Sequence, residues 1–413
     1  MKILHCADIH IGYETHGRLD PETGLNTRLL DFRRCFDFMV ARALAEDVDL
    51  FLFAGDAYRT PDPTPTQQKL FAEALAPIAR AGIPIAMIVG NHDHPVSFGK
   101  ASSVDIFPFL QGDVHVYRKP SFDTIQTKSG PIQLISLPWP IRSVILSRDE
   151  YRRQSPPEIR QLIEDRYADF VRTRVDKLDP SVPAVVAAHI AVHNAELSGS
   201  ERASLLAHEP RLTVAQLAPG PGVDYVAMGH IHRFQDLNAD AHARGDGPPV
   251  VYSSSIERIS FKEHDAPKGF VLVDIEESPA GRTTTYEFVH TPARRFVPIE
   301  VDARGEDEPT ATIVAAIAKE TITDAVVRVR YRVTEREASM VDAGAIRDAL
   351  RSADCVAAVE RVVDPVERRR TTLVRRETSI GDAVGLYVDQ HENLAPLREA
   401  LVAAALELDA EID

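Results

Sequence analysis

Five short apolar segments of this 413-residue chain each end at side chains that bind metal ions. Each is bounded by glycine, proline or polar residues and is rich in aliphatic or aromatic side chains, which predicts a buried strand. Strands that all end in ligands can place them along one edge of an α/β sheet. The sequence therefore predicts a metal site gathered from distant parts of the chain. The segments are KILHCA before Asp8 and His10, VDLFLFAG before Asp56, IPIAMIVG before Asn91 and His92, PAVVAA before His189, and VDYVAMG before His230 and His232.

The composition is typical of a soluble globular protein of two or three domains, with 44% hydrophobic and 26% charged residues. No stretch approaches the length of a membrane span, and no basic and apolar leader precedes the first strand, so we expect a cytoplasmic protein with no membrane partner. Cys6, Cys35 and Cys355 are scattered, which argues against disulfides and structural zinc. The net charge of −15 opposes bulk binding of nucleic acid, so any contact with DNA must be local.

The first of three predicted domains, residues 1–290, alternates apolar strands with helical stretches and carries the candidate metal site. After it, Thr291–Arg295 has the composition of a linker. The elements expected in this domain are helices at Leu29–Ala45 and Thr66–Ala81, a strand pair at Val250–Ser253 and Gly269–Ile275, and a hairpin turn within Glu276–Thr285.

A second, smaller domain is expected at residues 296–364. Thr310–Lys319 and Ala343–Arg351 have helical patterns, and Val326–Val333 between them has the pattern of a strand, which together predict a small α/β module. A second linker, with Pro365 and an arginine cluster, follows. That cluster can contact DNA or simply keep the linker soluble.

Strict alternation in the strand at residues 326–333 places Arg328, Arg330 and Arg332 on one face and apolar side chains on the other. An arginine face of this kind suits contacts with DNA phosphates. A solvated or ion-paired surface is the alternative.

The third predicted domain, residues 377–413, contains apolar side chains at helical spacing and predicts two amphipathic helices. These helices can pack on the same chain or bind a partner's helix or coiled coil, and periodicity alone does not separate the two. The apolar positions are Ile380, Val384, Tyr387, Leu394, Leu397, Leu401 and Leu408.

The ordered pattern D-x-H, G-D, G-N-H-D, H and G-H-x-H resembles that of the calcineurin-like metallophosphoesterases over the whole first domain. The resemblance implies an α/β fold with two packed β-sheets flanked by helices, and Asp56 as a carboxylate that bridges two ions. It assigns one ion to Asp8, His10, Asp56 and His232, and the other to Asp56, Asn91, His189 and His230.

The ligand types indicate the metal. Imidazole and carboxylate without thiolate suit borderline ions such as Mn²⁺, and two such ions can activate water for phosphoester hydrolysis. By the same resemblance His92 is not a ligand but contacts phosphate and donates a proton. Asp93 either orients His92 or is a turn residue. Gly55, Gly90 and Gly229 allow sharp turns where a Cβ would crowd the ions.

The segment after Asp56 and three other stretches are similar to DNA-repair nuclease subunits of the SbcD type. Tyr58 matches that family's aromatic residue, whereas Arg59 stands where the family has aspartate. The three other stretches are Met1–Gly12, Gly90–Asp93, and Val251–Arg258 leading to Lys268–Phe270.

This likeness implies a manganese-dependent 3'-to-5' exonuclease on duplex DNA and an endonuclease on single strands or hairpins. It also implies a capping domain and a homodimer bound to two SbcC-type ATPase subunits, whose coiled coils dock on the C-terminal helices. Helices expected around Thr66–Ala81 and Ser102–Leu110 lie where the family dimerises. The chain has no phosphate-binding G-x-x-x-x-G-K-[ST] loop, so any use of ATP must come from the partner.

Two other functions fit parts of the pattern. A stand-alone phosphoesterase for a small substrate agrees with the acidic net charge. A scaffold that has lost its metals is disfavoured, because every expected ligand is present.

Overall fold

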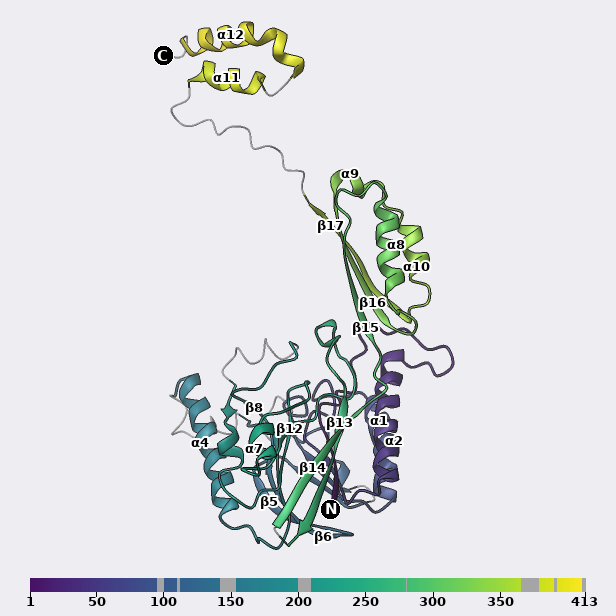
Figure 1. Cartoon of the computed structure of the whole chain (residues 1–413), viewed down its shortest axis with the longest axis vertical. Helices are drawn as coiled ribbons and strands as arrows, with labels where there is room; N and C mark the ends of the chain where they lie inside the picture. The colour runs from purple at the N-terminus through teal and green to yellow at the C-terminus, as the bar shows by residue number, and fades with distance from the viewer. Residues whose placement is uncertain are drawn as a thin grey trace. The chain divides into compact units, whose positions relative to one another are not determined.

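A computed structural model of the chain describes residues 1–94, 100–109, 112–141, 154–199, 209–279, 281–364, 379–389 and 392–410 (Figure 1). The chain forms two compact units. One contains Met1–Pro298, Glu320–Arg328 and Leu350–Ala358, and the other contains Ile299–Lys319, Val329–Ala349 and Val359–Asp413. The division into domains at 1–290, 296–364 and 377–413 stays a prediction. The predicted linker with Pro365 and the cluster Arg368–Arg376 lies outside the described residues.

The first six-stranded sheet has the order β14-β13-β1-β2-β3-β4. Strands β1 to β4 are parallel, while β13 pairs antiparallel with β1 and with β14. The parallel strands end at the same edge, as the ligand pattern requires. The strands are β1 (Lys2–Cys6), β2 (Leu50–Phe53), β3 (Ile85–Ile88), β4 (Val114–Tyr117), β13 (Gly269–Ser278) and β14 (Gly281–His290).

The second six-stranded sheet has the order β11-β12-β10-β7-β6-β5, with β6, β7, β10 and β12 parallel. A short parallel pair, β8 (Ala191–Val192) and β9 (Arg211–Leu212), lies beyond the end of β7. The strands of the large sheet are β5 (Ser121–Thr127), β6 (Gly130–Leu137), β7 (Ala184–His189), β10 (Tyr225–Gly229), β11 (Gln235–Asp236) and β12 (Val250–Tyr252).

The two sheets pack face to face, with helices on their outer faces. In β2, Leu50 and Leu52 join the core between the sheets, whereas Phe51 and Phe53 join the core under the helices. Strands buried on both faces have continuous apolar sequences, which is why these segments stand out in the chain. The expected fold of two packed sheets flanked by helices is confirmed. The first sheet is covered by α1 (Thr27–Ala45) and α2 (Pro65–Arg80), and the second by α4 (Pro156–Val175) and α6 (Val214–Leu217).

The helix starts have local causes. Asn26 caps α1 by accepting from the amide of Arg28. Thr64 and Gln67 form a reciprocal capping box at the start of α2, where Pro65 occupies the first helical position. The helices predicted at Leu29–Ala45 and Thr66–Ala81 are therefore confirmed to within two residues at each end.

Two expectations are wrong. Val250–Tyr252 and Gly269–Ser278 are not paired, because they belong to different sheets. The hairpin predicted within Glu276–Thr285 is confirmed, but its turn is shorter than the polar stretch, because the polar residues continue along the solvated sides of β13 and β14. The described part of Ser102–Leu110 forms turns and the 3₁₀ helix η1 (Phe107–Phe109) instead of an α-helix.

A three-stranded sheet has the order β15-β16-β17, and its neighbouring helices include α8 and α10. In β16 the apolar side chains are buried, Arg330 and Arg332 are exposed, and Arg328 is half-buried, so the predicted alternation is confirmed. The elements are β15 (Phe296–Asp302), α8 (Pro309–Lys319), β16 (Val326–Thr334), α9 (Glu335–Ala338), α10 (Ala343–Ala349) and β17 (Cys355–Asp364).

The C-terminal segment forms two helices that contact each other, α11 (Ile380–Val388) and α12 (Arg398–Ala410), joined through η4 (Glu392–Leu397). Arg398 at the start of α12 pairs with Asp389 at the end of α11 at 2.6 Å. The two predicted helices are confirmed. Among the described residues, no helix is both long and apolar enough to cross a membrane.

Candidate two-metal site

The ends of five parallel strands bring the predicted ligands together. The first sheet supplies Asp8, His10, Asp56 and Asn91, and the second supplies the histidines that follow β7 and β10. Ligand atoms of three groups each lie within 4.8 Å of one another, and most of these side chains are buried. The groups are Asp8, His10 and His232; Asp8, Asp56 and His189; and His10, Asp56 and His92.

The backbone at four of these positions is left-handed, a conformation that is unfavourable for residues other than glycine. The φ angles are 53° at Asp8, 53° at His10, 63° at Asp56 and 97° at His230. Hydrogen bonds between the loops hold this geometry. The amide of Asp8 donates to the carbonyl of Gly55 at 2.8 Å, and the amide of His230 donates to the carboxylate of Asp8 at 3.0 Å. Strain of this kind marks a site that the surrounding fold over-determines.

Two glycines leave room for the ligands. A Cβ on Gly55 would lie 2.2 Å from Nδ1 of His189, and a Cβ on Gly90 would lie 2.1 Å from Oδ1 of Asp56. Gly55 also has a φ of +102°. The predicted need for small residues at the strand ends therefore has a specific cause.

The tautomer of His189 indicates that the site suits a cation. Nδ1 of His189 lies 2.7 Å from the carbonyl oxygen of Ala54, which can only accept, so Nδ1 carries the proton. In the neutral ring, the Nε2 lone pair of His189 then faces Oδ1 of Asn91 at 3.0 Å and Oδ2 of Asp56 at 3.3 Å. Nε2 of His232 lies 3.0 Å from Nε2 of His10. A ring lone pair and acceptor oxygens that converge in a buried space, as they do at His189, call for a positive charge between them.

The pKa values agree with this conclusion. Burial opposes a charge on His189, but the neighbouring Asp56 carboxylate outweighs burial and raises the pKa of His189 to about 9. Burial also opposes ionisation of Asp56, yet His189 and His92 hold the pKa of Asp56 well below its ordinary value. The Asp56 carboxylate stabilises the proton on His189. The same carboxylate oxygens would bind a divalent ion, which would take the place of that proton.

His92 and Asp93 follow the same strand but have different surroundings. Nδ1 of His92 lies 2.6 Å from the backbone carbonyl of Arg59, and the His92 ring lies 4.8 Å from that of His10. The carboxylate of Asp93 accepts instead from the backbone amides of Asp56, Ala57 and Gly90, each at 2.9 Å. The expectation that Asp93 orients His92 is therefore wrong. Asp93 instead fixes the loops that carry the ligands, as the alternative that it is a turn residue would have it.

Comparison with known proteins gives the family. Residues 1–234 match the sequence profile of the family described as calcineurin-like phosphoesterase. The chain belongs to this family. A phosphoesterase of this kind uses two metal ions, in agreement with the gathered ligand groups.

The phosphoesterase is similar to three bacterial proteins that are named as the SbcD subunit of the nuclease SbcCD. The Bacillus subtilis protein is 28% identical over 291 residues, covering 66% of each chain. The Escherichia coli K12 protein is 24% identical over 261 residues, covering 61% of each. The Rhodobacter capsulatus protein is 27% identical over 346 residues, covering 78% of this chain and 77% of that one. The matches to the first two relatives thus span less than two thirds of their length.

Three residues near the ligands of the phosphoesterase have no counterpart in the sequence prediction. The carboxylate of Glu263 lies 2.9 Å from Nδ1 of His232, and that of Glu209 lies 3.3 Å from Nε2 of His230. The ring of Trp139 lies 4.9 Å from that of His230. Glu263 and Glu209 do not follow a buried strand, so the pattern that identifies the ligands gives no sign of them.

The arginines of β16 have separate environments. The guanidinium of Arg328 lies over the ring of Phe261 at 4.7 Å, and Arg330 pairs with Glu360 at 3.9 Å. Arg332 is exposed. A role of these arginines in binding DNA stays a prediction.

Proposed function

We propose that this phosphoesterase is the metal-dependent nuclease subunit of an SbcCD-type complex in the cytoplasm. It would hydrolyse DNA phosphodiesters as a 3'-to-5' exonuclease on duplex ends and as an endonuclease on single strands and hairpins. The observation that carries the reaction class is the convergence of the candidate ligands at the strand ends. Similarity to three proteins named as the SbcD subunit of the nuclease SbcCD supports the choice of substrate.

The proposed ligands divide between two ions, and their nitrogen and oxygen donors favour Mn²⁺. When bound, the ions supply positive charge that activates water and neutralises phosphate oxygens. The first site consists of Asp8, His10, Asp56 and His232, and the second of Asp56, Asn91, His189 and His230, with Asp56 shared. Nε2 of His189, Nε2 of His232 and the carboxylate of Asp56 all lie at this convergence.

His92 is the proposed proton donor to the leaving oxygen. The Arg59 carbonyl accepts from Nδ1 and so fixes the ring, which leaves Nε2 to face the substrate. In the imidazolium form Nε2 can contact a phosphate oxygen and transfer its proton. His92 is partly exposed beside the buried ligands, which suits a group that meets substrate.

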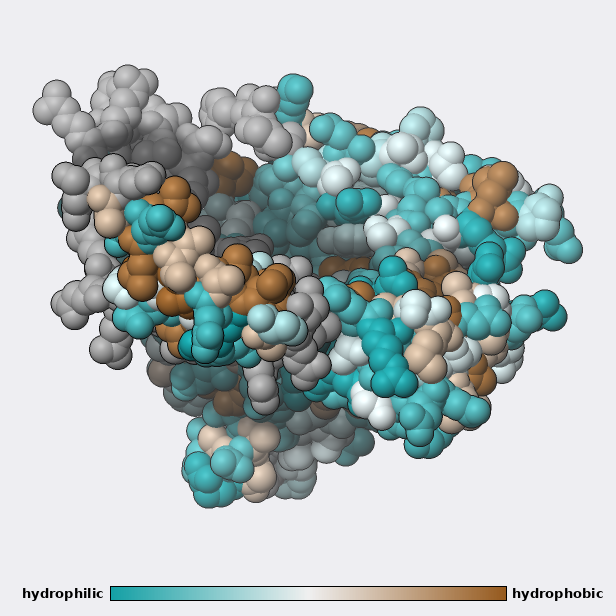
Figure 2. All heavy atoms as spheres, turned by 90° about the horizontal axis from the view of Figure 1, so that it is seen from above, coloured by the Kyte–Doolittle hydropathy of each residue, from teal (hydrophilic) through white to brown (hydrophobic). Residues whose placement is uncertain are grey.

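The C-terminal helix pair is the proposed docking element for the coiled coil of an SbcC-type ATPase. Apolar side chains are exposed on α11 and α12, and Figure 2 shows such residues gathered on this surface. Tyr387 is 55% exposed and Leu408 is 60% exposed. Exposed apolar groups at helical spacing fit a partner helix better than a helix pair that packs on its own chain.

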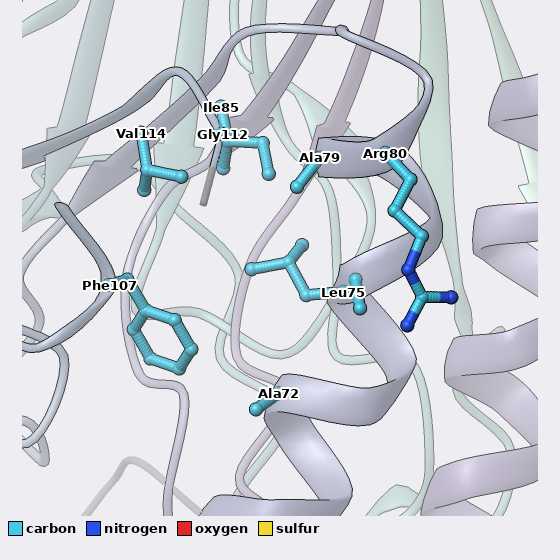
Figure 3. Close-up of a pocket in the computed structure, with 9 residues that line it drawn as sticks. Ala72, Leu75, Ala79, Arg80, Ile85, Phe107, Gly112 and Val114 are labelled. Atoms are coloured by element: carbon cyan, nitrogen blue, oxygen red, sulfur yellow. The ribbon is translucent and has the colours of Figure 1, made fainter. Parts of the chain in front are cut away.

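A homodimer is proposed at the face of α2. A cavity of about 390 Å³ opens between α2 and side chains of η1, β3 and β4, and Figure 3 shows Leu75 and Ala79 of α2 facing Phe107 and Val114. Phe109 beside it is 89% exposed. A second copy that covered this apolar surface would form a symmetric interface.

The alternative is a stand-alone phosphoesterase for a small substrate, which the net charge of −15 favours. An assay of DNA cleavage distinguishes the two functions. The chain and Mn²⁺ are incubated with an end-labelled DNA duplex and, separately, with a hairpin. The nuclease proposal expects cleavage that the Asp56→Asn variant lacks. Hydrolysis of a nucleotide or phosphoprotein without cleavage of either DNA would refute it.

A further inference from the structure

A buried ion pair contacts one candidate ligand at two points. Glu263, the last residue of the 3₁₀ helix η3 (Phe261–Glu263), and Lys268 both precede β13. Both side chains are fully buried, with Nζ of Lys268 3.0 Å from Oε2 of Glu263. Oε1 of Glu263 lies 2.9 Å from Nδ1 of His232. Nζ of Lys268 also donates to the backbone carbonyl of His232 at 2.9 Å. The pair therefore holds His232 at its ring and at its backbone.

The direction of the ring contact decides the tautomer. An ionised carboxylate can only accept, so Nδ1 of His232 carries the proton and Nε2 carries the lone pair in the neutral ring. That lone pair faces the candidate site, where Nε2 of His10 lies 3.0 Å away and Oδ1 of Asp8 lies 3.8 Å away. We propose that Glu263 and Lys268 are positioning residues for the first metal ion. Glu263 fixes the tautomer of His232, and Lys268 supplies the counter-charge that Glu263 needs in this buried loop.

The pair makes further buried hydrogen bonds. Oε2 of Glu263 also accepts from the amide of Ile259 at 3.1 Å, and Nζ of Lys268 donates to Oγ of Ser255 at 2.8 Å. Satisfied networks of this kind make a buried region rigid. Burying two charges is nevertheless seldom the best route to stability, since an apolar pair of similar volume often serves as well. A role in orienting a ligand accounts for the charges.

The other ligand histidines have different supports. His189 is oriented by the carbonyl of Ala54. His230 faces Glu209, whose side chain is 13% exposed and pairs with no lysine among its described contacts. Among the described contacts of His189, His230 and His232, those of His232 place a buried pair of opposite charges beside the ring, so this support can be tested by charge removal.

The inference rests on the metal centre of the proposed function and not on its DNA substrate. Two double variants of the full chain differ only in the acceptor that they offer to Nδ1 of His232. Both carry Lys268→Met; one adds Glu263→Gln, whose side-chain oxygen can still accept, and the other adds Glu263→Leu, which cannot. Glu196→Gln is the control, because Glu196 forms an exposed pair with Arg233 at 3.4 Å beside the same ligand.

Manganese titrated calorimetrically into the metal-free proteins gives the first readout. We expect the double variant with Glu263→Gln to keep both ions within several-fold of wild-type affinity. We expect the double variant with Glu263→Leu to bind one ion about 10-fold to 100-fold more weakly at unchanged thermal stability. The Glu196→Gln control should match the wild type. Equal manganese affinity in the two double variants would overturn the proposal, because a purely structural role depends on folding and not on the acceptor.

Nitrogen NMR of the metal-free wild type gives a second readout that needs no double variant. The His232 ring, assigned by the loss of its signals in His232→Gln, should carry its proton on Nδ1. A proton on Nε2 would overturn the proposal even if both double variants fail to fold. A wild-type chain that binds two manganese ions but cuts no DNA would refute the proposed substrate and leave the role of Glu263 standing.

Discussion

The predicted linker at Thr291–Arg295 contains an arginine that is anchored in the first unit, and this anchor gives a stability prediction. Arg294 donates to both oxygens of Asp31 at 2.6 Å. Arg28 donates to the same carboxylate at 2.6 Å, and the side chain of Asp31 is 1% exposed. Arg34 also lies 3.2 Å from Asp31, so this carboxylate pairs with three arginines, of which Arg28 is fully buried. We predict that Asp31→Asn destabilises this unit strongly.

The size of the expected destabilisation depends on the counter-charges that the two arginines Arg28 and Arg294 keep in the variant. Removing one partner of a buried ion pair costs about 3–5 kcal/mol, because the remaining charge has no counter-charge. Arg28 keeps Glu257 at 3.5 Å, and Arg294 keeps Asp354 at 3.5 Å. These longer contacts place the expected loss at the lower end of the range, about 3 kcal/mol.

Urea unfolding followed by circular dichroism measures this loss as a shift in the transition midpoint of the first unit. Asp37→Asn is the matched control on the same helix, since Asp37 is 50% exposed and pairs only with Arg33 among its described contacts. An exposed pair of that kind contributes about 0–1 kcal/mol. If Asp31→Asn lowers the free energy of unfolding no more than Asp37→Asn does, the buried network does not anchor the arginine.

Three further predictions concern the site. His92→Asn should abolish cleavage of labelled DNA while mass analysis still finds two metal ions per chain, and retained cleavage would contradict the donor role. Asp56→Asn should cost both ions together, because its carboxylate is the proposed bridge; one tightly held ion would argue against bridging. Gly90→Ala should weaken manganese binding at least 10-fold, measured by calorimetry against Gly220→Ala, whose added Cβ would meet no atom within 4 Å, because the Cβ at position 90 would lie 2.1 Å from Oδ1 of Asp56. Unchanged affinity in Gly90→Ala would mean that the Asp56 carboxylate can move aside.

The sequence contains the information for the candidate ligands because each lies directly behind a buried strand. Strands such as β2 are apolar on both faces, so their ends are visible in the sequence, and imidazole or carboxylate at such an end stands out. The helices α1 and α2 are likewise marked by their caps and by their periodicity. These features are local, so they can be recognised in a single sequence.

The features that sequence analysis misses depend on contacts between distant segments. Periodicity shows that β12 and β13 are buried but not which strands they pair with, and they lie in different sheets. The partners of Asp93 include backbone amides of Asp56 and Ala57, which no side-chain pattern reveals. Glu263 contacts His232 from the short 3₁₀ helix before β13. Support of a ligand is therefore harder to predict than the ligand itself.

The candidate metal centre also joins the two large sheets. Asp8, at the end of β1 in the first sheet, accepts from the amide of His230 at the end of β10 in the second. In the other direction, Nδ1 of His189 at the end of β7 donates a hydrogen bond to the carbonyl of Ala54, which follows β2. The strained backbone at Asp8 and at His230 is thus held by contacts across the interface between the sheets. Because the ligands of each proposed ion come from both sheets, the packing of the sheets sets the spacing of the ligands. A change in the core between the sheets should therefore alter metal binding even where it touches no ligand.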